Sequence, residues 1–286
     1  MTVPSHFGLK LVSPAGVGRF ETPSVDRATY LCAVDLRVSR RVGIRMVVGA
    51  LVAASTAITP TAIATPSNIA GMVVFIDPGH NGANDSSIGR QVPTGRGGTK
   101  DCQTSGTATN DGYQEHTFTW DTALRVRAEL NALGVRTAMS RSNDNAVAAC
   151  VDQRAEMANA LHPNAVISLH GDGGPASGHG FHVNYSAPPL NAAQAGPSVQ
   201  YAQIMRDQLQ ASGIPPANYI GQNGLYGRSD LAGLNLAQYP SILVELGNMK
   251  NSTDAALMES PDGRQKYAEA VVRGVAGFLA TLGQAR

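Results

Sequence analysis

The chain has 286 residues, of which 43% are hydrophobic and 15% charged, a composition typical of a globular protein. Its formal net charge is only +1, so the overall charge gives no electrostatic reason to expect a nucleic acid or an anionic membrane as partner. Glycine is abundant, at 31 residues, and aromatic residues make up 5%, which predicts long glycine-rich loops at the surface.

Residues 1–64 are predicted to be an N-terminal extension and a signal peptide. A basic block without acidic residues, 37–45, precedes an apolar stretch, 46–58, which is shorter than the roughly 20 residues that span a bilayer. Ala62-Ile63-Ala64 then supplies the small-x-small pattern of a cleavage site. We expect export to the periplasm, the cell envelope or the outside of the cell. The mature chain would start near Thr65 and have no stable membrane span; a buried N-terminal helix is the alternative.

The three cysteines fit this compartment. Cys32 would be lost with the signal region, which leaves Cys102 and Cys150 as an even pair in an oxidising environment. We expect a disulfide between these two residues, closing a loop of about 50 residues. Two free thiols are the alternative.

Beyond Thr65, strand-like and helix-like segments alternate along the chain. Apolar runs predict strands, and apolar residues at a spacing of three to four predict helices. The predicted strands are 72–76, 135–140, 165–169, 180–185 and 241–245, and the predicted helices are 115–133, 151–161, 198–211 and 263–282. This alternation predicts a single α/β domain over residues 65–286, with a twisted, mostly parallel or mixed sheet flanked by helices on both faces.

Two histidines follow apolar runs that read as buried strands. Val73-Val74-Phe75-Ile76 leads through a turn-forming Asp-Pro-Gly to His80, and a second apolar run leads to His170. In open α/β sheets the carboxyl ends of the strands form the ligand-binding edge. Two histidines delivered to one edge indicate a metal site, for which a polar loop position is the alternative.

Two glutamates are placed to complete such a site. Glu115 begins the helix that follows the first strand, so topology brings it close to His80, although the adjacent His116 is a rival ligand. Glu245 ends another apolar strand at the same edge, where a carboxylate suits a general base. The structural alternatives are a helix-dipole partner for Glu115 and an ion pair with an arginine for Glu245.

The segment that follows His80 breaks the strand and helix pattern. Residues 81–113 are rich in Gly, Thr and Ser and predict a long loop or a hairpin-like insertion. Because long loops in compact domains are commonly functional, we expect this insertion to control access to the metal. Residues 186–197, rich in Ala and Pro, predict a surface excursion.

Several motifs resemble those of one enzyme family. Asp77-Pro78-Gly79-His80-Asn81-Gly82 looks like the opening motif of the zinc-dependent N-acetylmuramoyl-L-alanine amidases of the amidase-3 type, which are peptidoglycan hydrolases. The other similar positions, in chain order, are Glu115, Ser140-Arg141, Asp144, Arg154, Ala158-Asn159, 168–172 and 243–251. Gly171, Asp172 and Asn248 depart from the usual residues of these motifs. The resemblance extends from about Val73 to the C-terminal helix.

The resemblance implies an activity, a cofactor and a substrate. The activity is hydrolysis of the amide between the lactyl group of N-acetylmuramic acid and the L-alanine of the stem peptide, in cell-wall turnover as an autolysin. Zn²⁺ would be held by His80, Glu115 and His170, and Glu245 would transfer the proton. Peptidoglycan or its muropeptide fragments would be the partner of a monomeric enzyme.

Other readings of the same residues stay open. His/Glu/His with a glutamate base also serves zinc carboxypeptidases, and a peptidoglycan-binding regulator with a structural zinc is a non-enzymatic alternative. Arg228, Asp230 and Asn251 are candidate substrate contacts, the first two because a glycine-rich loop before the last strand suits binding of a stem-peptide carboxylate.

Overall fold

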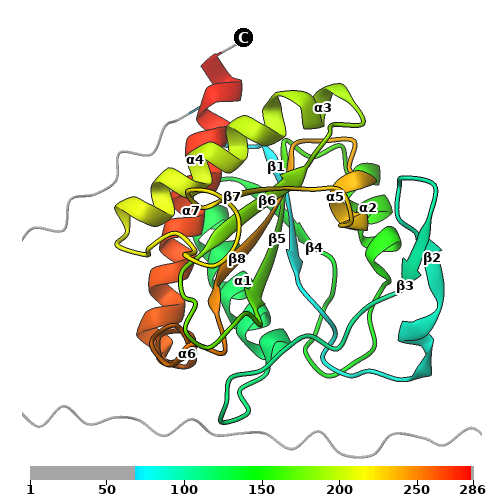
Figure 1. Cartoon of the computed structure of the whole chain (residues 1–286). Helices are drawn as coiled ribbons and strands as arrows, with labels where there is room; N and C mark the ends of the chain where they lie inside the picture. Colours follow the sequence, from blue (N-terminus) through cyan, green and yellow to red (C-terminus); the bar gives the residue numbers. More distant parts are fainter. Residues whose placement is uncertain (1–67, 285–286) are drawn as a thin grey trace, which may run out of the picture. The chain divides into compact units, whose positions relative to one another are not determined.

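The computed structural model describes residues 68–284, which contain a six-stranded sheet with the strand order β4-β1-β5-β8-β6-β7 (Figure 1). Its strands are β1 (Val73–Pro78), β4 (Arg136–Met139), β5 (Ala165–Asp172), β6 (His182–Ser186), β7 (Leu225–Arg228) and β8 (Ser241–Asn248). All neighbouring strands are parallel except β6 and β8. The expected mostly parallel sheet is therefore confirmed.

Helices cover both faces of this sheet. They are α1 (Glu115–Ala132), α2 (Val151–Ala160), α3 (Ala192–Ala195), α4 (Pro197–Ala211), α5 (Ala232–Asn235), α6 (Ser252–Glu259) and α7 (Pro261–Gln284). Helices α1, α4 and α7 pack on one face around the main apolar core, whereas α2 and α5 contact each other and lie over the other face (Figure 1). Among the described residues no helix is long and apolar enough to cross a membrane.

Side chains along β1, β5 and β8 alternate between the two faces, as a pleated strand requires. Ile76, Ile167 and Val244 point into the main core and are fully buried. On the opposite face Asp77, Ser168 and Leu243 are only partly buried although they lie in central strands. This second face, beneath α2 and α5, is where the candidate site lies.

Three sequence expectations needed correction. Strands β5 and β8 run on past the predicted ends, so His170 lies inside a paired strand and not on the loop after it, and Glu245 lies within its strand and not at the end. The cause is parallel pairing, which places His170 opposite Glu245 and continues through a bulge to Asp172. The segment 186–197 is not a simple surface excursion. Its Gln194 is buried and donates hydrogen bonds to the carbonyls of Leu234, Asn235 and Ala237.

The insertion after His80 forms a small hairpin. A 3-10 turn, Ser86–Gly89, precedes β2 (Gln91–Pro93) and β3 (Thr99–Asp101), which pair antiparallel. The predicted disulfide is present and joins Cys102, next to β3, to Cys150, the residue before α2. The predicted signal peptide, Cys32 and the domain boundary at residue 65 lie outside the described residues.

Replacing both Cys102 and Cys150 by serine is expected to lower the free energy of unfolding by about 2–4 kcal/mol. The bridge joins residues that are 48 positions apart, so its loss frees a long loop in the unfolded chain. Denaturant unfolding under oxidising conditions measures the effect. Reductant should lower the stability of the native protein and leave the double variant unchanged; equal midpoints for the two proteins would contradict the prediction.

Candidate metal centre

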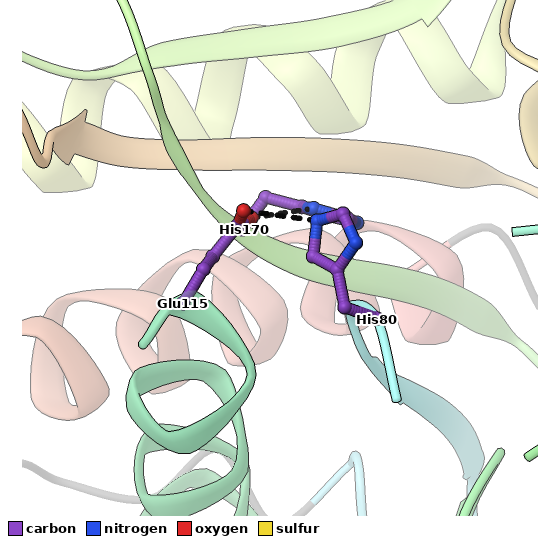
Figure 2. A group of neighbouring side chains, drawn as sticks. All are labelled: His80, Glu115 and His170. Carbon is purple, nitrogen blue, oxygen red and sulfur yellow. Dashed lines mark hydrogen bonds and ion pairs between the residues drawn. The ribbon is translucent and has the colours of Figure 1, made fainter. Parts of the chain in front are cut away.

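His80, Glu115 and His170 converge at the carboxyl ends of β1 and β5, above the first turn of α1 (Figure 2). His80 Nε2 lies 3.0 Å from Glu115 Oε2, and His170 Nδ1 lies 3.0 Å from Glu115 Oε1. One ligand atom from each residue lies within 4.8 Å of the other two. Two imidazole nitrogens and one carboxylate, with an edge open to a cavity, form a donor set that fits a catalytic zinc ion.

The backbone around His80 is shaped to direct its ring. His80 has a φ of 64°, a left-handed conformation that is uncommon for residues other than glycine. Before it, Gly79 leaves room for the ring of His170, which a Cβ on Gly79 would approach to 2.3 Å. The carbonyl of Thr104, in the insertion, lies 2.9 Å from His80 Nδ1. Because a carbonyl only accepts, Nδ1 carries a proton, so Nε2, which is hydrogen-bonded to Glu115 here, is the nitrogen that would offer its lone pair to a metal.

Glu115 is buried as the first residue of α1, and the polar groups around it favour its charged form. Its Oε2 accepts a hydrogen bond from the backbone N–H of Thr107, and its Oε1 accepts one from that of Gly171. Burial alone would raise the pKa of Glu115, but the charge of His80 and hydrogen bonds from both histidines hold that pKa well below its usual range. Glu115 is therefore ionised, the form in which a carboxylate could bind a metal ion.

Glu245 lies beside the three residues without joining them. It is opposite His170 in the β5–β8 pairing and lines the same cavity of about 370 Å³. Its Oε2 is buried without a hydrogen-bond partner, and within residues 68–284 it forms no ion pair, so the arginine alternative is not supported. Burial, with the nearby charges of Glu115 and Asp172, raises the pKa of Glu245 well above its usual value.

His116 does not take part in this cluster. Its Nδ1 lies 2.9 Å from Oδ1 of Asp144, which also accepts a hydrogen bond from Arg141. As expected for consecutive helical residues, Glu115 and His116 point in different directions. Of the two rival candidates, the structure brings Glu115 and not His116 next to His80 and His170.

Each of the three candidate substrate contacts already has a hydrogen-bond partner within the protein. The Arg228 guanidinium makes two hydrogen bonds, of 2.8 and 2.6 Å, to the Asp230 carboxylate. Asn251 caps the N-terminus of α6, and its Nδ2 donates to the carbonyl of Ala176. Its amide is thus engaged in local structure, which was not anticipated. A substrate contact by Arg228, Asp230 or Asn251 stays a prediction.

His182, which no sequence motif singled out, lies next to Glu245, the candidate general base. It pairs directly across β6 and β8 with Glu245, and its buried Nδ1 has no hydrogen-bond partner. Burial lowers the pKa of His182 to about 4, so the ring is neutral at physiological pH. The rings of Tyr219 and Tyr226 approach it edge-on, and the Tyr219 hydroxyl donates to Asp172. The alternation of the predicted strand 180–185 was the one signal that could have placed His182 on this face.

Comparison with known protein families matches residues 74–277 to the amidase-3 family, described as N-acetylmuramoyl-L-alanine amidase. The chain belongs to this family. Among curated amidases it is 82% identical to N-acetylmuramoyl-L-alanine amidase Rv3717 of Mycobacterium tuberculosis over 241 residues, which are 84% of this chain and 100% of that relative.

Solved amidase structures are similar as well. The amidase Ami1 of Mycobacterium smegmatis is 76% identical, with a TM-score of 0.75 over 75% of this chain and 99% of that chain. The apo form of Ami1 of Mycobacterium abscessus is 66% identical, with a TM-score of 0.73 over 74% and 100% of the two chains. These similarities agree with the fold and family expected from the motifs.

Proposed function

We propose that this protein is a zinc-dependent N-acetylmuramoyl-L-alanine amidase that cleaves the amide between the lactyl group of N-acetylmuramic acid and the L-alanine of the stem peptide. The observation that carries the proposal is the His80–Glu115–His170 cluster with Glu245 in the same cavity. Family membership and the amidase names of the similar proteins support the reaction class.

His80, Glu115 and His170 would hold the ion, and the remaining position would face the cavity. When bound, zinc supplies Lewis acidity that lowers the pKa of a water molecule toward 7 and polarises the scissile carbonyl. A dication there also adds positive charge beside Glu245, which favours the carboxylate form over the protonated form that burial favours. Glu245 can then accept a proton from the attacking water.

The same carboxyl group completes the reaction. Once protonated, Glu245 donates that proton to the nitrogen of L-alanine as the carbon–nitrogen bond breaks, so the products are the muramoyl carboxylate and the free stem peptide. The Thr104 carbonyl and the Thr107 N–H meanwhile hold His80 and Glu115 in position. Part of the insertion thus supports the ligands. The turn of its hairpin, residues 94–98, is tied to the domain through Arg96, which donates hydrogen bonds to Asn235 and Ser186.

The proposal also covers where the protein acts and its oligomeric state. We expect an exported monomer acting on peptidoglycan or muropeptides in the cell envelope or outside the cell. The basic and apolar segments before residue 65 support export.

Chelation is expected to abolish muropeptide hydrolysis, and added Zn²⁺ should restore it. Mass spectrometry of the products from a defined muropeptide identifies the bond that is cleaved. A free, complete stem peptide supports the amidase. Stem peptides shortened at the carboxyl end would indicate the carboxypeptidase instead, and zinc-loaded protein that binds muropeptide but releases no product would indicate the binding regulator.

A further inference from the structure

The cavity that holds the metal-binding residues continues inward along the sheet. One end, at the paired residues His170 and Glu245, is called the mouth because the His170 side chain is 15% exposed. The other, at Phe75 and Val166, which are paired in neighbouring strands, is called the deep end because these residues are 1% and 8% exposed. Val166 and His170 are four residues apart on one strand and face the same side. At roughly 3.3 Å per residue the deep end is about 13 Å from the mouth.

Small side chains on the covering helices keep this space open. Ala155 and Ala158 of α2 and Ala232 of α5 line it from above. Leu243 shows that the space is accessible: it lies in β8, a central strand of the sheet, yet its side chain is only partly buried. A cavity of about 370 Å³ therefore extends from the metal centre into the interior of the domain.

The walls of the inner part offer few free polar groups. Halfway along, Asp77 accepts hydrogen bonds from Ser168, Ser140 and Arg154, so these polar side chains are already paired with one another. The apolar Leu243 lies beside Ser168 on the same face of the sheet, because the two residues pair across β5 and β8. At the deep end Phe75, Val166 and Ala158 form an apolar cluster. The deep end thus suits an apolar group, whereas the mouth suits an anionic or metal-binding group.

We propose that this cavity binds straight-chain monocarboxylic acids and their hydroxamates, with the head group at the metal centre and the alkyl tail directed toward Phe75 and Val166. The place of the head group rests on the function proposed above; the place of the tail rests on the cavity alone. Such ligands would compete with the muropeptide for the metal centre.

Calorimetric titration of the zinc-loaded full chain with hydroxamates of increasing length tests the proposal. Each methylene that leaves water should improve affinity about fourfold. Octanohydroxamate should therefore bind at least about a hundredfold more tightly than acetohydroxamate.

Two leucine variants locate the tail. Ala158→Leu fills the deep end and should remove the dependence on chain length while acetohydroxamate still binds. Ala160→Leu, on the exposed side of the same helix, is the matched control and should keep the dependence. Ala155→Leu repeats the test from another position on α2 if Ala158→Leu fails to fold.

The outcomes separate this proposal from the proposed function. If acetohydroxamate binds but affinity does not rise with length, or if the rise persists in both α2 variants that line the cavity, the tail site is refuted and the metal centre stands. If the native protein takes up no zinc and binds no hydroxamate, the metal centre is refuted, and the head-group site with it.

Discussion

Glu245→Gln is expected to lower the rate of muropeptide hydrolysis by about 10²–10⁴-fold while zinc binding is kept. Glutamine has nearly the shape of glutamate but cannot accept the proton of the attacking water or return it to the leaving nitrogen. Glu245 lines the cavity beside the three ligands without joining them, so its replacement leaves the donor set intact. Steady-state kinetics on a defined muropeptide and metal analysis of the purified variant measure the two effects.

Glu156→Gln is the matched control, because Glu156 is exposed on α2. This variant should retain the native rate. The fall for Glu245→Gln should be in kcat, with a much smaller change in KM, since the carboxylate acts in the chemical step. Full activity of Glu245→Gln would show that another group transfers the proton. A parallel loss of zinc would show that Glu245 acts as a ligand.

The order of strands and helices was predictable because each long element has its own apolar pattern and ending. Helix α1, for example, is followed by Gly134, whose φ of 78° suits the left-handed turn after a helix. The extensions of β5 and β8 were not predictable, since they depend on pairing between distant segments. The three-residue strands β2 and β3 and the four-residue helix α5 are too short for a periodic pattern.

The convergence of the candidate site was predictable from topology. In the sequence His80 and Glu245 follow apolar runs and Glu115 begins a helical pattern, and parallel strands bring such positions to one edge. The surroundings depend on tertiary contacts that no local pattern indicates. The position of His182 beside Glu245 follows from one antiparallel register, and the cavity follows from small residues on α2 that read in the sequence as ordinary helix formers.

Arg154→Leu is expected to lower the free energy of unfolding by about 3–5 kcal/mol and to weaken zinc binding. The buried guanidinium donates to the Asp77 carboxylate, to the backbone carbonyls of Pro78, His80 and Ala149, and to the side chain of Asn81. Leucine fills much of the volume but leaves the Asp77 charge and these acceptors unpaired. Since His80 belongs to the turn that Arg154 holds, its ring should no longer be fixed in one orientation, and zinc binding should weaken. Denaturant unfolding and zinc titration measure the two losses.

The pH dependence of the unfolding free energy tests whether loss of the Asp77–Arg154 pair causes the lower stability of Arg154→Leu. Burial would raise the pKa of Asp77, but Arg154 and the hydroxyls of Ser140 and Ser168 lower it from 3.8 to about 2. The pair therefore stabilises the fold fully above pH 3.8, and this contribution is lost as the pH falls through about 2. In Arg154→Leu the stability should change less over that interval than in the native protein.

Arg127→Leu, at an exposed position of α1, should change the unfolding free energy by less than about 0.5 kcal/mol and keep the native pH dependence. An Arg154→Leu variant as stable as this control would show that the guanidinium does not hold the turn of His80.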